Sequence, residues 1–225
     1  ASNATLVNSF LVRFLDYNDM GGGGHNSDSI PAILAISERE KAGGRDFLAS
    51  LVVSYELGDR ITASSKGSTI EGTGWKGDLR GGLSMPPTLG RLMGLNEEQI
   101  ANAIGICMSH ALPLGILDAH REENVMAKNI RFGWVAHDAI LACMLAKKGF
   151  TGPVRIVESD AGIRNVIVQG EMDLERLTDF SGWRILNVKF KAMPTNSTTF
   201  GHVLATMSIV KEHDLKPGDI AAVHI

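Results

Sequence analysis

Apolar residues recur every three or four positions through most of the first 150 residues, which is the spacing of amphipathic α-helices. Leu6, Phe10 and Phe14 set this spacing in the first segment. The pattern predicts a series of helices over residues 4–15, 31–41, 46–58, 88–95, 97–112 and 128–148.

Residues with preferences for helix ends support these boundaries. Pro31 fits the first turn of the second helix, where its missing N–H is not needed, with Ser27 or Asp28 as the N-cap. Asn96 and Gln99 have the spacing of a capping box. Glycines commonly end helices, and two predicted helices are followed by one, at Gly94 and Gly149.

The pattern changes after residue 149, where short apolar runs replace the helical period. These runs predict further elements, namely strands over residues 154–158, 166–168 and 185–190, a helix over 198–210 and a strand over 220–225. Residues 61–83 are rich in glycine and lack periodicity, so we expect a long loop there.

The predicted fold class is therefore mainly α. We expect a large helical-bundle domain over residues 1–180, followed by the start of a smaller α+β domain over residues 181–225. The strand at the end of the chain has no partner strand in sight, so we expect the fold to continue in a longer protein.

Composition narrows the class of partner. The chain has 225 residues, 44% of them hydrophobic, and a formal net charge of −3. No run of like charge is long enough to indicate a nucleic-acid groove or an anionic membrane surface, so we expect a small molecule or a protein as partner. Cys107 and Cys143 lie in apolar helical patterns, which is typical of buried thiols in a reducing compartment such as the cytoplasm. No apolar stretch is long enough to span a membrane, and no signal segment is visible.

Two carboxylates and a histidine flank the run of four glycines. Asp16 and Asp19 follow the first predicted helix, where the helix dipole disfavours negative charge, and His25 begins the next segment. A carboxylate in an unfavourable place suggests a functional reason. The alternative is that the aspartates cap local backbone and that His25 is an ordinary loop histidine.

Lysines near turns form a second group of candidates. Lys128 starts a long apolar helix, where a cation would add to the attraction for a carboxylate; the alternative is a solvated lysine. Lys76 lies in a glycine-rich segment that could equally be a structural turn. Lys191 precedes hydroxyl and amide side chains, including Asn196 and Thr198, that could hold an anion or simply cap a helix. The histidines and cysteines lack metal-ligand spacing, so we expect no metal site.

Several motifs in order resemble one family. Residues 12–19 (VRFLDYND) and 25–28 (HNSD) are similar to the RxLDxND…HxSD signature of the MmgE/PrpD family. This family includes 2-methylcitrate dehydratases, cis-aconitate decarboxylases and iminodisuccinate epimerases. Further matching landmarks follow in the same order at residues 92–100 (LMGLNEEQI), 126–128 (MAK), 149–153 (GFTGP) and 191–194 (KAMP).

The resemblance implies a fold and a chemistry. It implies a helical domain and a smaller α+β domain, an active site in the cleft between them, a homodimer, and chemistry on di- or tricarboxylates without a metal or other cofactor. It also implies that family members are about twice as long as this chain.

The resemblance also assigns roles. His25 would be the acid/base, because an imidazole suits proton transfer near neutral pH. Asp16 would orient that imidazole. Lys128 would bind a substrate carboxylate and stabilise enolate-like charge, with Lys191 as a second anion contact; the other predicted substrate-binding residues are Lys76, Asn196 and Thr198.

The predicted function is that of a lyase, which dehydrates a 2-methylcitrate-like hydroxy-polycarboxylate, because RxLDxND is closest to the dehydratase branch. An epimerase or isomerase of a dicarboxylate and a non-catalytic carboxylate-binding module are the alternatives. The chain departs from the family pattern at Met20, at Lys76 and after Lys191, where a threonine and further histidines are usual. These departures leave His25 as the one strong histidine and argue against decarboxylation.

Overall fold

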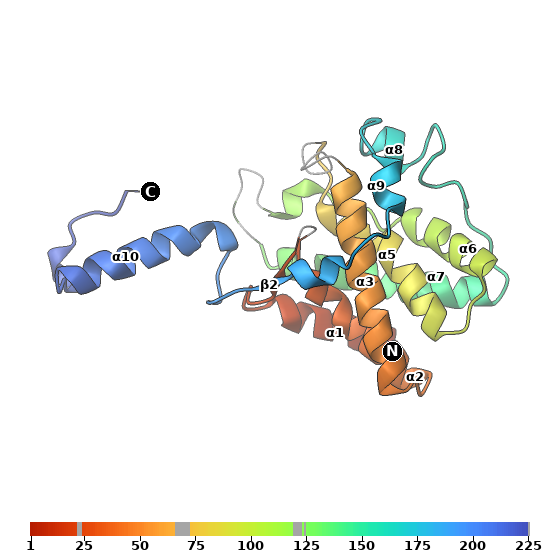
Figure 1. Cartoon of the computed structure of the whole chain (residues 1–225), viewed down its shortest axis with the longest axis horizontal. Helices are drawn as coiled ribbons and strands as arrows, with labels where there is room; N and C mark the ends of the chain where they lie inside the picture. The colour runs from red at the N-terminus through yellow and green to blue at the C-terminus, as the bar shows by residue number, and fades with distance from the viewer. Residues whose placement is uncertain (22–23, 66–72, 119–122, 124, 225) are drawn as a thin grey trace.

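The computed structural model describes residues 1–21, 24–65, 73–118, 123 and 125–224. Five longer helices form the body of the molecule (Figure 1). They are α1 (Ser2–Arg13), α3 (Gly44–Ser64), α5 (Arg80–Leu92), α6 (Glu97–Met108) and α7 (Ala127–Lys147), and the shorter α2 (Ile30–Arg39) packs beside them. The prediction of a mainly α fold is confirmed.

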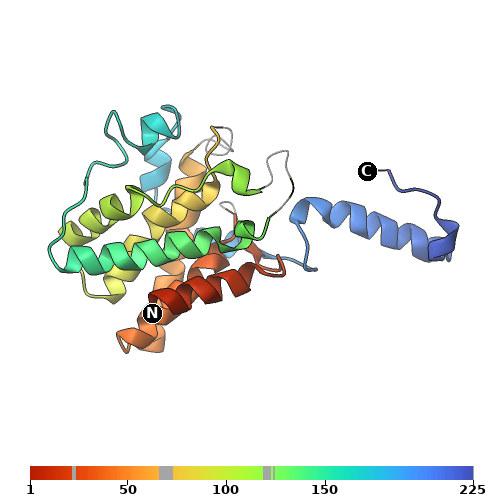
Figure 2. The same ribbon diagram turned by 180° about the vertical axis from the view of Figure 1, so that it is seen from behind.

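Helix α5 lies at the centre of this body, because it packs against α3, α6 and α7. Helix α1 lies along α7, as Figure 2 shows from behind. The main core is formed where α2, α5, α6 and α7 meet, around side chains such as Ile33, Met85, Leu89 and Ile140. A second apolar cluster lies under the segment after α7 and includes Leu79, Met108 and Val168.

The predicted loop over residues 61–83 is wrong at both ends, where the structure has helices. Residues 61–64 complete α3, residues 77–79 form a 3₁₀ turn, and α5 begins at Arg80; residues 66–72 lie outside the described part of the chain. A Cβ at Gly82 would lie 2.2 Å from Sδ of Met108, and one at Gly81 would lie 2.9 Å from the Phe132 ring. These glycines are therefore helical residues that let α5 approach its neighbours closely.

The observed helix ends and caps match the predicted ones in part. Asn96 forms the predicted capping box with Gln99, and Gly94 and Gly149 have positive φ angles of 71° and 88° after their helices. The predicted side-chain cap of α2 is wrong. A 3₁₀ turn over Asn26–Ser29 precedes α2, and its Asp28 side chain binds Arg13 instead.

The predicted strands are mostly wrong. Residues 154–158 form turns, Ile163–Val166 is the short helix α8, and residues 220–224 are not a strand. Residues 184–187 form a 3₁₀ turn, and only Lys189–Phe190 is a strand (β2), paired antiparallel with Asp19–Met20 (β1). An apolar run becomes a strand only where a partner strand satisfies its backbone, and β1 offers only two residues.

Two further helices follow. Leu174–Thr178 forms α9, which packs on α3. Phe200–Glu212 forms α10, which confirms the predicted helix over 198–210 but has no buried residue, and it stands away from the helical body in both views (Figures 1 and 2). The division of the chain at residue 180 stays a prediction. Within the described residues, no helix has both the length and the apolar character needed to cross a membrane.

Candidate active site

His25 lies in the short segment between β1 and α2, and its backbone and ring are both held. Its ring Nδ1 forms a hydrogen bond with the main-chain carbonyl of Asp19. Its own carbonyl accepts a hydrogen bond of 3.2 Å from Nη2 of Arg80. The Asp19 carboxylate in turn accepts bonds from the amide and hydroxyl of Ser27, at 3.1 and 2.7 Å. The half-buried imidazole is therefore held through one ring nitrogen, and the backbone of His25 is held by Arg80.

This bonding pattern defines the protonation of the ring. A carbonyl can only accept, so Nδ1 carries the hydrogen and Nε2 of the neutral ring carries the lone pair. Burial is the largest influence on the pKa of His25 and lowers it; the Asp19 carbonyl opposes this effect, and the nearby charges of Arg13 and Lys191 lower it further. His25 is therefore a neutral base at pH 7.

A network of buried charges underlies the segment that carries His25. Arg13 of α1 lies 2.6 Å from Oδ2 of Asp28, and Asn18 donates to the other oxygen of that carboxylate at 3.1 Å. Asp78 binds Arg131 of α7 and lies 3.4 Å from Nη1 of Arg80. Burial would raise the pKa of Asp78, but Arg131, Arg13 and Arg80 hold it at about 2, so the carboxylate stays ionised.

Asp16 and Lys191 meet although they are far apart in sequence. Nζ of Lys191 donates to the Asp16 carboxylate at 2.9 Å, to the Asp16 carbonyl at 2.6 Å and to the Thr195 carbonyl at 3.1 Å. An ammonium has three donors, and these bonds use all three. In this structure Lys191 therefore links two segments, while its predicted contact with a substrate anion stays a prediction.

The predicted orienting role of Asp16 is replaced by a different contact. The Asp16 carboxylate binds Lys191, and the group that orients the His25 ring is the Asp19 carbonyl. Asp16 has a positive φ of 49°, which turns the chain out of α1 towards β1. Asp16 thus lies in the segment that leads to β1, and its carboxylate binds Lys191 rather than the imidazole.

Lys128 lies in the first turn of α7, half-buried. One turn later, Arg131 binds Asp78, which joins α7 to the charged residues under His25. Helix α7 also contacts the turn over Asn26–Ser29. The start of α7 and the segment that carries His25 therefore lie at the same end of the helical body.

The remaining predicted substrate-binding residues are Lys76, Asn196 and Thr198. Lys76 is half-buried, and its amide donates to the Pro113 carbonyl at 2.9 Å, which ties its segment to the chain after α6. Asn196 and Thr198 are exposed before α10, where Asn196 accepts bonds from the amide and hydroxyl of Thr198. This is helix capping, the alternative that the sequence left open. Their roles in substrate binding stay predictions.

The sequence predicted no role for the arginines that bind the buried carboxylates near His25. Arg13, Arg80 and Arg131 are each buried, at 4–6% exposed. One signal was available: on α1, the polar residues Thr5, Ser9 and Arg13 recur every four positions and form the buried face. A polar stripe at that spacing indicates a helix that buries hydrogen-bonding groups, which need partners elsewhere in the chain.

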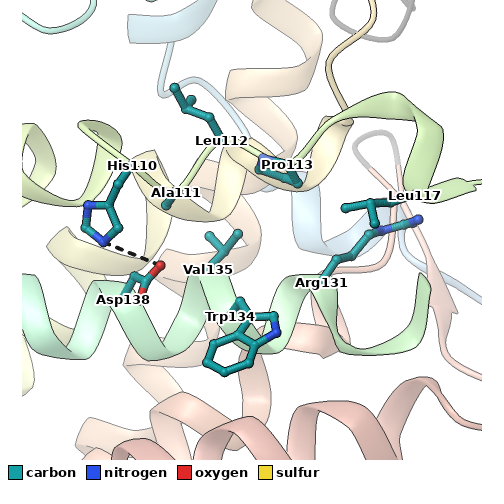
Figure 3. A pocket seen from close by; sticks show the side chains of 9 residues that line it. All are labelled: His110, Ala111, Leu112, Pro113, Leu117, Arg131, Trp134, Val135 and Asp138. Carbon is teal, nitrogen blue, oxygen red and sulfur yellow. Dashed lines mark ion pairs between the residues drawn. The ribbon is translucent and has the colours of Figure 1, made fainter. Parts of the chain in front are cut away.

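A pocket of about 210 Å³ lies between α7 and the segment after α6 (Figure 3). His110 and Asp138 lie at one end, 3.5 Å apart between Nε2 and Oδ2, and Arg131 lies at the other. The exposed indole of Trp134 lies between them. No predicted site residue lines this pocket. In the described part of the chain, no three histidine, cysteine or acidic side chains are grouped so as to hold a metal ion.

Comparison with known proteins identifies the family of this chain. The sequence pattern of the MmgE/PrpD N-terminal domain matches residues 1–175. The cis-aconitate decarboxylase-like protein oryM of Aspergillus oryzae is 27% identical over an alignment of 206 residues, which covers 84% of this chain and 42% of that protein. Cis-aconitate decarboxylase of Aspergillus terreus is 26% identical over 168 residues, 71% of this chain and 34% of that enzyme.

The chain thus spans less than half the length of the curated relatives it matches. Their names are those of decarboxylases, so they do not support the predicted dehydratase branch over the decarboxylase branch.

Proposed function

Because the chain belongs to the MmgE/PrpD family, we propose that it forms part of a lyase whose base, His25, removes a proton from a carbon beside a carboxylate of a di- or tricarboxylic acid. The observation that carries this proposal is the bond between Nδ1 of His25 and the Asp19 carbonyl. That bond leaves the lone pair on Nε2, and the lowered pKa keeps the ring neutral. A base of this kind is ready at neutral pH.

The reaction that fits such a base is dehydration of a hydroxy-polycarboxylate of the 2-methylcitrate type. Nε2 of His25 takes the proton, the electrons of the broken C–H bond form the carbon–carbon double bond, and the hydroxyl group leaves as water with the proton that the His25 imidazolium now carries. Negative charge builds on the neighbouring carboxylate during proton removal. Lys128 is our candidate for stabilising this charge, because it lies at the same end of the body as His25.

Decarboxylation is the second candidate, and the names of the relatives favour it. Loss of carbon dioxide leaves a carbanion that an acid must protonate. A neutral imidazole is a poor donor, so this reaction would need a proton from another group. The protonation of His25 therefore favours dehydration, and the comparison favours decarboxylation.

Separate reactions of the whole protein with 2-methylcitrate, citrate and cis-aconitate test these candidates. Dehydration produces an alkene that absorbs in the ultraviolet, and decarboxylation releases carbon dioxide from cis-aconitate. Deuterium uptake from heavy water without loss of water would indicate an epimerase instead. We expect dehydration, with His25→Gln losing roughly 10²- to 10⁴-fold in kcat.

The matched control is His110→Gln, because the His110 side chain is about half exposed and lies outside the site. It should keep wild-type turnover. Binding of these acids without turnover, with affinity unaffected by His25→Gln, would show a binding module and overturn the proposal.

A further inference from the structure

We propose that Arg80 is a positioning residue for His25, because its guanidinium joins the buried carboxylate of Asp78 to the main-chain carbonyl of His25. The inference rests on the proposed role of His25 as the base. It concerns how the fold holds that base in place. Arg80 is the first residue of α5, so it connects the site to the central helix of the body.

The guanidinium of Arg80 is buried, and both of its terminal nitrogens donate hydrogen bonds. Nη1 donates to the Gly77 carbonyl at 3.1 Å and to Oδ1 of Asp78 at 3.4 Å, and Nη2 donates to the His25 carbonyl at 3.2 Å. The central carbon of the group lies 5.8 Å from the centre of the Phe132 ring. With its side chain only 5% exposed, Arg80 has little freedom to adopt another rotamer.

The backbone before His25 packs directly on this guanidinium. Gly24 has a φ of 107°, a conformation that favours glycine, and a Cβ at this position would lie 3.3 Å from Nη2 of Arg80. The absence of a side chain at Gly24 thus lets the chain approach Arg80. The guanidinium contacts both the His25 carbonyl and the backbone at Gly24. Its position therefore determines where the His25 backbone lies.

Arg80 is itself held by Asp78, which two other helices fix. The Asp78 carboxylate binds Arg131 of α7 through Oδ2 and lies 4.0 Å from Arg13 of α1 through Oδ1. Contacts therefore run from α1 and α7 through Asp78 and Arg80 to His25. A planar guanidinium can contact a carboxylate and a carbonyl at once through separate nitrogens, whereas a lysine ammonium acts as a single point.

The test compares substitutions of two buried arginines. Arg80→Lys keeps a cation beside Asp78 but loses the fork that reaches His25. The control is Arg60→Lys, because Arg60 is buried like Arg80 and also binds a carboxylate and a main-chain carbonyl, those of Glu56 and Gly182. We expect Arg80→Lys to lower kcat by roughly 10- to 100-fold, because small displacements of a catalytic group are costly. KM should stay within about threefold for both variants, and kcat of Arg60→Lys within about threefold of wild type.

A second readout does not depend on turnover. The C2 proton of His25 can be titrated by NMR, with His25→Gln identifying its signal. In Arg80→Lys the loosened backbone admits water to the ring, so the pKa of His25 should rise towards its ordinary value of about 6.5. In Arg60→Lys it should stay as in the wild type.

Equal changes in both variants, in kcat or in the titration, would show that the arginines act only on stability and would overturn the positioning role. If the whole protein turns over none of the acids, the proposed function fails. The titration then still decides whether Arg80 positions His25.

Discussion

Nζ of Lys191 lies 2.9 Å from the Asp16 carboxylate, although 175 residues separate the two in sequence. The Lys191 side chain is almost fully buried, and Asp16 is partly open to solvent, with its side chain 28% exposed. The two-stranded pairing of β1 with β2 lies beside this contact. Together they join the end of α1 to a segment near the other end of the chain.

Lys191→Met should destabilise the protein by about 2–3 kcal/mol, because it leaves the Asp16 carboxylate and two carbonyls without their donor. The free energy of unfolding in urea measures this effect. Lys189→Met is the matched control, since Lys189 lies two residues earlier, in β2, but is exposed. A loss below about 0.5 kcal/mol in Lys191→Met, as expected for a surface substitution, would contradict a stabilising role of this contact.

The rate of turnover should rise with pH. If Nε2 of His25 acts as the base, kcat/KM increases as the pH passes through the pKa of His25, which burial lowers below its ordinary value, and then reaches a plateau. A pH profile of kcat/KM checks this behaviour. A rate that falls over the same range would indicate that His25 acts as an acid, which is the requirement for protonating a carbanion.

The stability of the protein should also depend on the protonation of His25. Because its pKa is lowered in the folded state, the unfolded chain binds more protons once the pH falls below about 6.5. Folding stability is therefore lost as the pH falls from there towards the folded-state pKa. Unfolding in urea at a series of pH values should show the wild type losing more stability than His25→Gln.

Asp78→Asn should be among the most damaging substitutions. The buried carboxylate faces Arg131, Arg80 and Arg13, and removing its charge leaves three guanidinium groups without their common partner. We expect a loss of about 3–5 kcal/mol in unfolding free energy. Asp46→Asn, which breaks the exposed pair with Arg91, should cost less than about 1 kcal/mol. Similar losses in both variants would show that burial of the network adds nothing.

Gly58→Ala tests the packing next to His25. A Cβ at Gly58 would lie 2.5 Å from Oδ1 of Asn26, whose Nδ2 donates to Asp59 at 2.8 Å. The added methyl must displace Asn26, at a cost of about 1–3 kcal/mol, and should lower kcat because His25 is the adjacent residue. Gly201→Ala in α10 is the control: a Cβ there meets no atom within 4 Å. Wild-type stability and kcat in Gly58→Ala would contradict this account.

The sequence predicted the helices well because their apolar period is a local signal. The capping box at Asn96 and the glycine ends at Gly94 and Gly149 are also local, since each depends on residues within a few positions. Glycine misled the prediction at Gly81 and Gly82, where it serves contact between helices. Whether a glycine opens a loop or allows close packing depends on neighbours such as Met108, which are distant in sequence.

The site was predicted only in part for the same reason. His25, Asp16 and Lys191 were identified as members of motifs, but which of them touch is decided by the fold. Asp28 was predicted to cap α2. Its carboxylate instead binds Arg13, because the fold brings α1 and the turn before α2 together. The burial of Arg13 and Arg131 depends on carboxylates supplied by other segments of the chain, and only the polar spacing along α1 gave a local signal for Arg13.

The pairing of β1 with β2 determines the order in which the parts of the protein can fold. Helices α1 to α7 can form and pack on one another as soon as their own residues are available, because the contacts among them lie within the first 150 positions. Lys191 can reach Asp16 only after the chain has been synthesised through residue 191, so this contact forms after the helices have packed. A chain cut at residue 175, where the match to the family domain ends, would keep helices α1 to α7 and lose this late contact.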